Sequence, residues 1–141
     1  AALDMIHDEG LEAVWQRHET LARAVWAACD AWGAEGDLSL NIADPALRSH
    51  AVTARRLKAP QATELRDWVE GNIGLTLGIG LGMAPKGSPE SHGFFRLGHM
   101  GHVNGQMIMG MLGGIEAGMS ALGIKRGSGA LEAAAKVIGG A

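Results

Sequence analysis

The order of helical and extended patterns in this chain predicts an α+β fold, a two-layer sandwich in which helices cover a small, mostly antiparallel sheet. A long amphipathic helix comes first, and short extended segments then flank a helix in the middle. Two further helices end the sequence. The 141 residues contain no repeat or internal linker, and this length fits one domain.

The first part of the chain predicts two helices. Residues 1–9 have a helical pattern, and Gly10 is expected to end it as a left-handed cap. A second helix is predicted from Leu11 to Trp32, ended by Gly33. Side chains at alternating three- and four-residue steps line one face of it: Leu11, Val14, His18, Leu21, Val25, Cys29 and Trp32.

The middle of the chain predicts strands on either side of a third helix. Residues 37–42 are a candidate strand, and residues 49–57 are the clearest one because Val52 and Thr53 favour extended backbone. Pro60 suits the start of a helix, where its missing N–H is not needed. Gly71 and Asn72 are expected to end that helix.

The next segment predicts two strands around a loop. Residues 73–83 are apolar and punctuated by glycines, which suits a strand with close backbone neighbours. Residues 84–93 contain two prolines and two glycines, so a loop is expected there. Residues 94–97 predict a short strand.

The last part predicts two helices. Residues 103–122 form the longest apolar pattern, with one stripe through Val103, Met107, Met111, Ile115, Met119 and Leu122. Gly110, Gly114 and Gly118 recur every fourth residue, which indicates that another element packs closely on this helix. The final helix is predicted over residues 128–138, with Ser128 as its N-cap.

Composition limits the classes of function. The net charge of −3 provides no basic surface for nucleic acid or an anionic membrane. Only 19% of residues are charged, below the usual share of about 25%, which suggests that another domain or subunit covers part of the surface. The single Cys29 and the absence of a signal-peptide pattern favour a reducing, cytoplasmic location.

The helical pattern already begins at Ala1. We therefore expect residues 1–10 to be the tail of a helix that connects from another domain, and residues 11–141 to be the domain itself. A trimmed initiator or tag residue would produce the same start.

Arg96 is the main candidate for binding chemistry. It lies on a predicted strand and is followed by Gly98, so its planar fork of N–H groups could approach a carboxylate with little obstruction. From spacing alone, a surface ion pair with an acidic side chain is the simpler explanation of such an arginine.

The other motifs are weaker candidates for a functional site. His99 and His102 are three residues apart, with His92 upstream, but the intervening glycines make the turn irregular, so backbone hydrogen bonds are expected rather than a metal site. The glycine-rich residues 78–83 place Met83 where a dinucleotide fingerprint requires glycine. No nucleophile lies close to a base. The sequence predicts no catalytic, cofactor-binding or metal-binding residue within the chain.

The segment Phe94-Phe95-Arg96-Leu97-Gly98-His99-Met100-Gly101, followed by the helix from His102 to Met107, resembles the end of class V (fold type I) aminotransferases. The group with this signature includes alanine–glyoxylate, serine–glyoxylate and pyridoxamine–pyruvate aminotransferases. Weaker similarities are Ala2–Glu12 with Arg17-His18, which resembles the passage between the two domains, and Ser49–Ala54, which resembles the first small-domain strand.

The resemblance implies that this chain is the C-terminal small domain of an enzyme that uses pyridoxal 5'-phosphate. The cofactor lysine would lie in a large domain, because none of Lys58, Lys86, Lys125 and Lys136 matches its segment. Arg96 would bind the α-carboxylate of a small amino or oxo acid such as alanine, serine, glyoxylate or pyruvate. The full enzyme would be a homodimer, and this chain alone would be inactive without cofactor.

Two other functions remain open from the sequence. One is a non-catalytic α+β module that binds a small effector or a partner protein, which the order of elements from Ser49 to Leu122 would suit. The other is a stand-alone enzyme that uses His92, His99 and His102.

Overall fold

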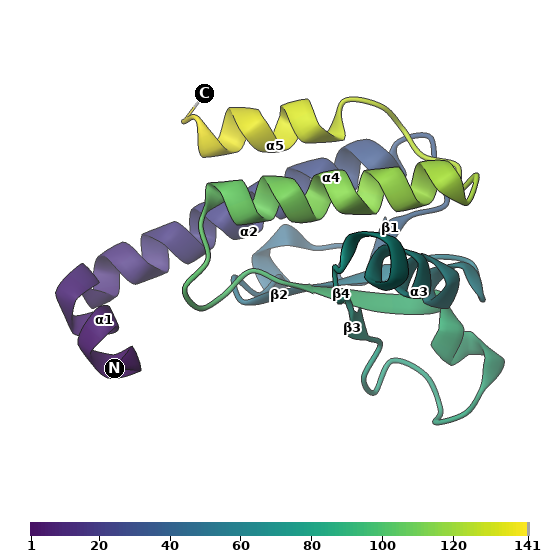
Figure 1. Ribbon diagram of the computed structural model, residues 1–141, viewed down its shortest axis with the longest axis horizontal. Coiled ribbons are helices and arrows are strands. Elements are labelled where there is room, and N and C mark those ends of the chain that lie inside the picture. Colours follow the sequence, from purple (N-terminus) through teal and green to yellow (C-terminus); the bar gives the residue numbers. More distant parts are fainter. Residues whose placement is uncertain (141) are drawn as a thin grey trace.

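The computed structural model describes residues 1–140, which contain five α-helices, two short 3₁₀ helices and a four-stranded sheet (Figure 1). The α-helices are α1 (Ala2–Glu9), α2 (Leu11–Gly33), α3 (Gln61–Ile73), α4 (Gly105–Ala121) and α5 (Ala130–Ile138). The strands are β1 (Ser39–Leu40), β2 (Val52–Arg56), β3 (Gly78–Ile79) and β4 (Phe94–Gly98). The 3₁₀ helices are η1 (Pro45–Leu47) and η2 (Pro89–Gly93).

The sheet has the strand order β1-β2-β4-β3, and every neighbouring pair is antiparallel. In the central pair, Arg55 lies opposite Phe95 and Ala54 lies opposite Arg96. Successive side chains of a strand point to opposite faces. Arg55 and Phe95 therefore share one face of the sheet, and Arg96 points from the other.

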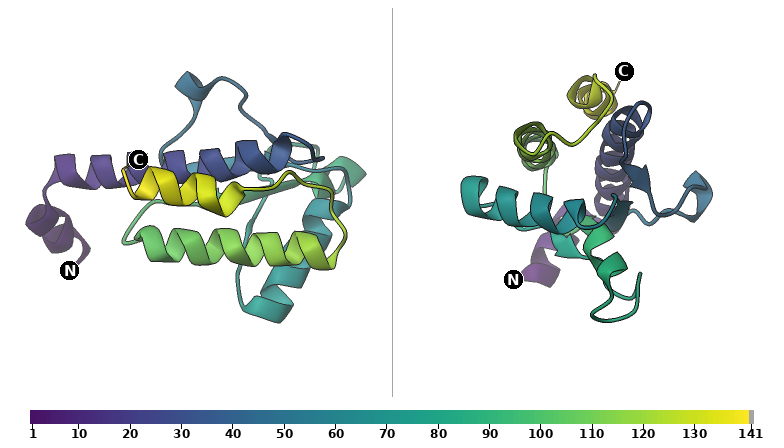
Figure 2. Two further views of the ribbon diagram at one scale, coloured as in Figure 1. Left: turned by 90° about the horizontal axis from the view of Figure 1, so that it is seen from above. Right: turned by 90° about the vertical axis from the view of Figure 1, so that its right-hand side faces the viewer.

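The helices cover one face of this sheet (Figures 1 and 2). Helices α2 and α3 each contact α4 and the strands, and α5 packs against α2 and α4. The core between the layers is built around Trp32, Leu65, Phe95, Leu97 and Ile115, all essentially inaccessible to solvent. No α-helix of residues 1–140 covers the opposite face. The predicted α+β architecture is confirmed.

Helix α1 is a separate element that projects from the start of α2 (Figure 1). Gly10 ends it as predicted, but its backbone angles of φ 87° and ψ 134° differ from those of a left-handed cap. No residue of α1 is buried, and Leu3 is 70% exposed.

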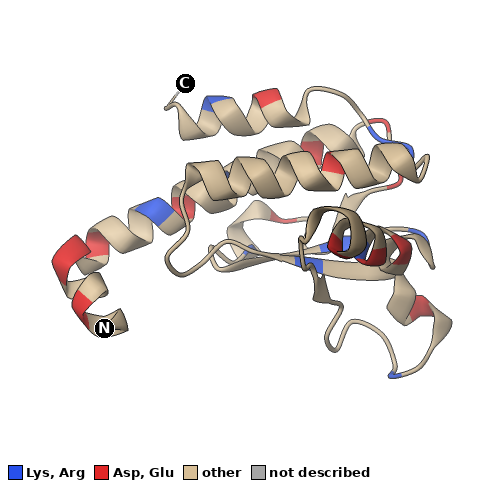
Figure 3. Ribbon diagram, viewed as in Figure 1, with Lys and Arg blue, Asp and Glu red and all other residues tan. Residues whose placement is uncertain are grey.

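Helix α4 buries a different stripe from the predicted one. Ile115 and Met119 are buried, but Met107 and Leu122 at the two ends are exposed, and Ile108 and Leu112 take their place in the core. The helix carries one charged residue and is nearly uncharged along its length (Figure 3), so apolar periodicity offers little contrast between its faces. Among the described residues, no helix combines the length and apolar character needed to cross a bilayer.

The glycines of α4 pack closely at two of the three predicted positions. A Cβ atom on Gly118 would lie 2.8 Å from both Leu65 Cδ1 and Val69 Cγ1 of α3. One on Gly114 would lie 3.3 Å from Leu75 Cδ2, whereas one on Gly110 would meet nothing within 4 Å. Contact with α3 and with Leu75, which follows it, therefore explains Gly114 and Gly118 only.

Three boundary predictions were wrong. Gly71 and Asn72 do not end α3, which continues through Ile73 and ends at Gly74, a residue with a left-handed φ of 74°. The strand predicted over residues 73–83 is reduced to Gly78–Ile79. Ser128 does not cap the last helix, since Gly129 occupies the N-cap position and no side chain bonds there.

Candidate functional site

Arg96 lies on β4, in the interior of the sheet, and projects from the face that no α-helix covers. Its two cross-strand neighbours are small, Ala54 on β2 and Gly78 on β3. A Cβ atom on Gly78 would lie 3.2 Å from Arg96 Cβ and 3.5 Å from Arg96 Nε. The glycine therefore leaves room for the arginine stem, as the sequence indicated for this segment.

The stem of Arg96 is held by a single bond, in which Nε donates to the carbonyl oxygen of Ile79 at 2.7 Å. Within residues 1–140, no Asp or Glu forms an ion pair with Arg96, and its two terminal nitrogens have no hydrogen-bond acceptor. Arg96 is therefore not engaged in a surface ion pair with any residue of 1–140, which was the alternative explanation of this arginine. The guanidinium retains the geometry that binds a carboxylate through two parallel hydrogen bonds.

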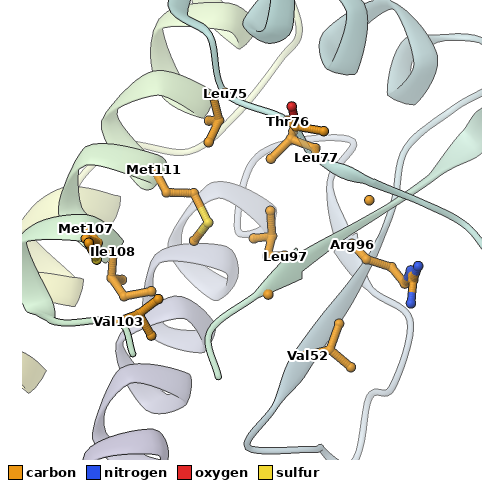
Figure 4. A pocket seen from close by; sticks show the side chains of 12 residues that line it. Val52, Leu75, Thr76, Leu77, Arg96, Leu97, Val103, Met107, Ile108 and Met111 are labelled. Atoms are coloured by element: carbon orange, nitrogen blue, oxygen red, sulfur yellow. The ribbon is translucent and has the colours of Figure 1, made fainter. Parts of the chain in front are cut away.

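A cleft of about 440 Å³ lies beside the strand that carries Arg96 (Figure 4). Its apolar wall comes from Leu75, Leu97, Met107 and Met111, which converge between α4 and the segment before β3. The Arg96 side chain extends away from this wall, on the side of Val52. Arg96 also lines this cleft, which is apolar on the side of α4, and its charged end points away from that side.

His99, just after β4, is fully buried in a hydrogen-bonded chain rather than available at a surface. Its Nε2 lies 2.8 Å from Thr53 Oγ1, which also accepts a bond from Trp26 Nε1 at 2.9 Å, and its Nδ1 lies 3.0 Å from the carbonyl oxygen of His50. Because the carbonyl only accepts, Nδ1 carries the proton and Nε2 accepts from Thr53. Burial lowers the pKa of His99, which favours this neutral form.

The turn that follows Arg96 is tied to α2 by Arg17 and His18. Arg17 Nη1 donates to the carbonyl oxygens of Gly101 and Val103 at 2.8 and 2.9 Å, while its other nitrogens form a two-pronged ion pair with Glu9. The Gly101 N–H donates to His18 Nε2 at 3.1 Å. These bonds join α1, α2 and the end of β4, which sequence spacing could not reveal.

The three histidines considered in the sequence do not meet. His99 is in the core, His102 is exposed beside α1, and His92 Nδ1 lies 2.9 Å from Thr63 Oγ1 near α3. The prediction that these residues bond backbone groups is confirmed for His99. Among residues 1–140, no three His, Cys, Asp or Glu side chains come together as a possible metal site.

Arg55 is the polar residue that sequence reasoning missed. It is 0% exposed on the helix-covered face, and its Nη2 donates to the carbonyl oxygen of Cys29 at 3.2 Å. Its Nε and Nη1 have no partner within residues 1–140. Burial lowers the pKa of Arg55 and raises that of the Cys29 thiol to about 11, so this cysteine is a poor nucleophile.

Comparisons with known proteins now define the class. No protein-family model matches the chain. A serine–glyoxylate aminotransferase of Arabidopsis thaliana is 33% identical over 119 residues, which cover 82% of this chain and 27% of that protein. A protein of Synechococcus sp. (strain PCC 6716), named the small subunit of a soluble hydrogenase, is 34% identical over 122 residues, 86% of this chain and 29% of that protein.

Among solved structures, pyridoxamine–pyruvate aminotransferase from Mesorhizobium loti matches with a TM-score of 0.82 and 30% identity, over 98% of this chain and 33% of that one. The fold is therefore that of an aminotransferase small domain. The chain is therefore homologous to aminotransferases, among them serine–glyoxylate and pyridoxamine–pyruvate enzymes, over one part of their length. It spans between 27% and 33% of the length of these relatives.

Proposed function

We propose that this chain is the C-terminal small domain of an aminotransferase for small amino and oxo acids, in which Arg96 binds the substrate α-carboxylate. The observation that carries the proposal is the free guanidinium of Arg96, flanked by Ala54 and Gly78 and held only through its Nε. Serine, glyoxylate and pyruvate, the small acids in the names of two relatives, each carry such a carboxylate.

Arg96 would act by orientation. Two parallel N–H···O bonds fix the plane of a carboxylate, and the bond to Ile79 fixes the arginine itself. Hydrogen bonds to a charged group contribute about 1.5–3 kcal/mol. Because β4 lies inside the sheet and its end is bonded to α2, little conformational freedom is lost when the substrate binds.

The residues of this chain do not fit pyridoxal phosphate. Its four lysines are exposed, and none lines the cleft beside Arg96. We therefore place the cofactor in a large domain, with residues 1–10 as the connection and residues 11–141 as the small domain. The full enzyme would be a cytoplasmic homodimer, and this chain alone would form no stoichiometric, borohydride-reducible adduct with the cofactor.

Substitution of Arg96 in the full-length enzyme tests the proposal. Arg96→Ala should lower kcat/KM at least about 100-fold, which corresponds to about 2.7 kcal/mol of lost transition-state binding. Arg56→Ala is the matched control, because Arg56 lies on the same face but stacks over the Phe94 ring, 5.2 Å from its centroid. Equal kinetics for wild type and Arg96→Ala would contradict the assignment.

The effector-binding alternative makes a different prediction. A full-length protein without transaminase activity, combined with saturable binding of a carboxylic acid to the present chain, would favour a non-catalytic module.

A further inference from the structure

A second cavity, of about 630 Å³, lies between α3 and the segment that joins β3 to β4. It shares no lining residue with the cleft beside Arg96. Its volume falls within the range of about 300–1,000 Å³ that is usual for small-molecule sites. The cavity is therefore large enough for a ligand of its own.

The charged groups of this cavity all have the same sign. Arg66 and Lys86 line it and no Asp or Glu does, although the whole chain has a net charge of −3. Arg66 is held by one bond, from Nε to the carbonyl oxygen of Leu77 at 3.2 Å, and neither cation forms an ion pair within residues 1–140. The two cations thus line one cavity, and their terminal nitrogens have no partner within residues 1–140.

Part of the remaining wall of the cavity is apolar. Ile79 is 52% exposed and Leu81 is 68% exposed, both among the lining residues. Thr63, in the first turn of α3, bonds His92 of η2 at 2.9 Å and so ties the two sides of the cavity together. The positive end of the α3 dipole adds to the attraction for an anion.

We propose that this cavity binds a small organic anion, a carboxylate with an apolar or aromatic body. The carboxylate would bind Arg66 and Lys86, while the body would cover Ile79 and Leu81 and remove their apolar surface from water. The cavity adjoins Arg96 through the Ile79 carbonyl, which accepts the Arg96 Nε bond, but Arg96 does not line it, so the proposal does not depend on the function proposed above.

Titration of the ¹⁵N-labelled chain with phenylacetate, followed by amide chemical shifts, tests the proposal. We expect the largest saturable shifts at residues 63–66 and 79–92. Acetate lacks the apolar body and phenylacetamide lacks the charge, so each should bind at least about tenfold more weakly, which corresponds to about 1.4 kcal/mol. Equal affinity for phenylacetate and phenylacetamide, or shifts centred elsewhere, would overturn the proposal.

Variants assign the residues. Lys86→Gln should raise the Kd for phenylacetate about tenfold, as should Arg66→Gln. Lys86 is exposed and its side chain makes no hydrogen bond within residues 1–140, so its substitution leaves the fold intact even if loss of the Arg66 bond does not. Lys125→Gln and Lys136→Gln are controls that should leave the Kd unchanged, because neither lysine lines the cavity. An unchanged Kd in Lys86→Gln, or a Kd raised as much in Lys125→Gln as in Lys86→Gln, would sink the idea.

Discussion

Arg55 and Arg96 occupy neighbouring strands of one sheet but have opposite surroundings. Arg55 is fully buried under the helices, with one bond to the Cys29 carbonyl and two nitrogens without a partner in residues 1–140. Arg96 lies on the other face, half-buried, between two small residues. Arg55 lies opposite Phe95, and the next residue of β4, Arg96, lies opposite Ala54. One step along the strand therefore decides whether an arginine is enclosed in the core or can reach a ligand.

The difference shows what each face of the sheet does. The covered face carries the core, and the polar groups of Thr53 and His99 in it are satisfied by each other and by backbone. The uncovered face keeps small residues around Arg96. We therefore expect changes on the covered face to alter the free energy of unfolding, and changes at Arg96 to alter binding.

The largest difference in the free energy of unfolding is expected between variants at two adjacent residues of β4. Phe95→Ala removes a ring that is 0% exposed on the covered face and should lower the free energy of unfolding by about 3–5 kcal/mol. Arg96→Ala should lower it by no more than about 1 kcal/mol, since only the bond to Ile79 is lost. Urea unfolding followed by tryptophan fluorescence measures both. Similar losses for the two variants would break the comparison between the faces.

A smaller effect of opposite sign is expected at Arg55. Arg55→Met keeps much of the side-chain volume and removes buried nitrogens that lack a partner in residues 1–140, so the free energy of unfolding should rise by about 1–3 kcal/mol. Arg96→Met, made in parallel, should change it by no more than about 1 kcal/mol. A clear loss of stability in Arg55→Met would mean that the bond to the Cys29 carbonyl outweighs the burial of the charge.

The smallest effect concerns pH. Burial lowers the pKa of His99 from its ordinary value of 6.5, so the unfolded chain takes up a proton at a higher pH than the folded one. Stability should be complete above about pH 6.5 and fall as the pH decreases toward the folded pKa, by at most about 1.4 kcal/mol per pH unit. Thermal unfolding between about pH 7 and 5 measures this slope. His99→Leu should flatten it and His102→Gln should not; an unchanged slope in His99→Leu would refute the assignment.

Sequence patterns were sufficient to locate the ends of helices where a single glycine or proline determines them. Gly10 and Gly33 bound the helix that begins at Leu11, and Pro60 directly precedes α3, because chain-breaking residues act within one turn. The prominence of Arg96 also followed from local sequence, as a strand arginine before Gly98. The boundary errors near Ile73 and Ser128 arose where several glycines made more than one end point acceptable.

The alternation along β2 shows what local rules could not supply. Val52 and Ala54 are the more apolar pair and would be expected to face the core, yet Thr53 and Arg55 do. Their polar groups become acceptable only because Trp26, His99 and the Cys29 carbonyl come from distant parts of the chain. Pairing with β4 selects the buried face, and no pattern within β2 contains that information.

The amino-acid sequence alone was enough to establish the α+β class, the order of the elements and the resemblance that singles out Arg96, since these depend on local propensity and on motifs. The tertiary structure alone established which face of the sheet is covered, that His99 belongs to the core, and that Arg66 and Lys86 share a cavity. These features depend on contacts between residues far apart in the chain, and such contacts form only when the sheet and the helices pack together.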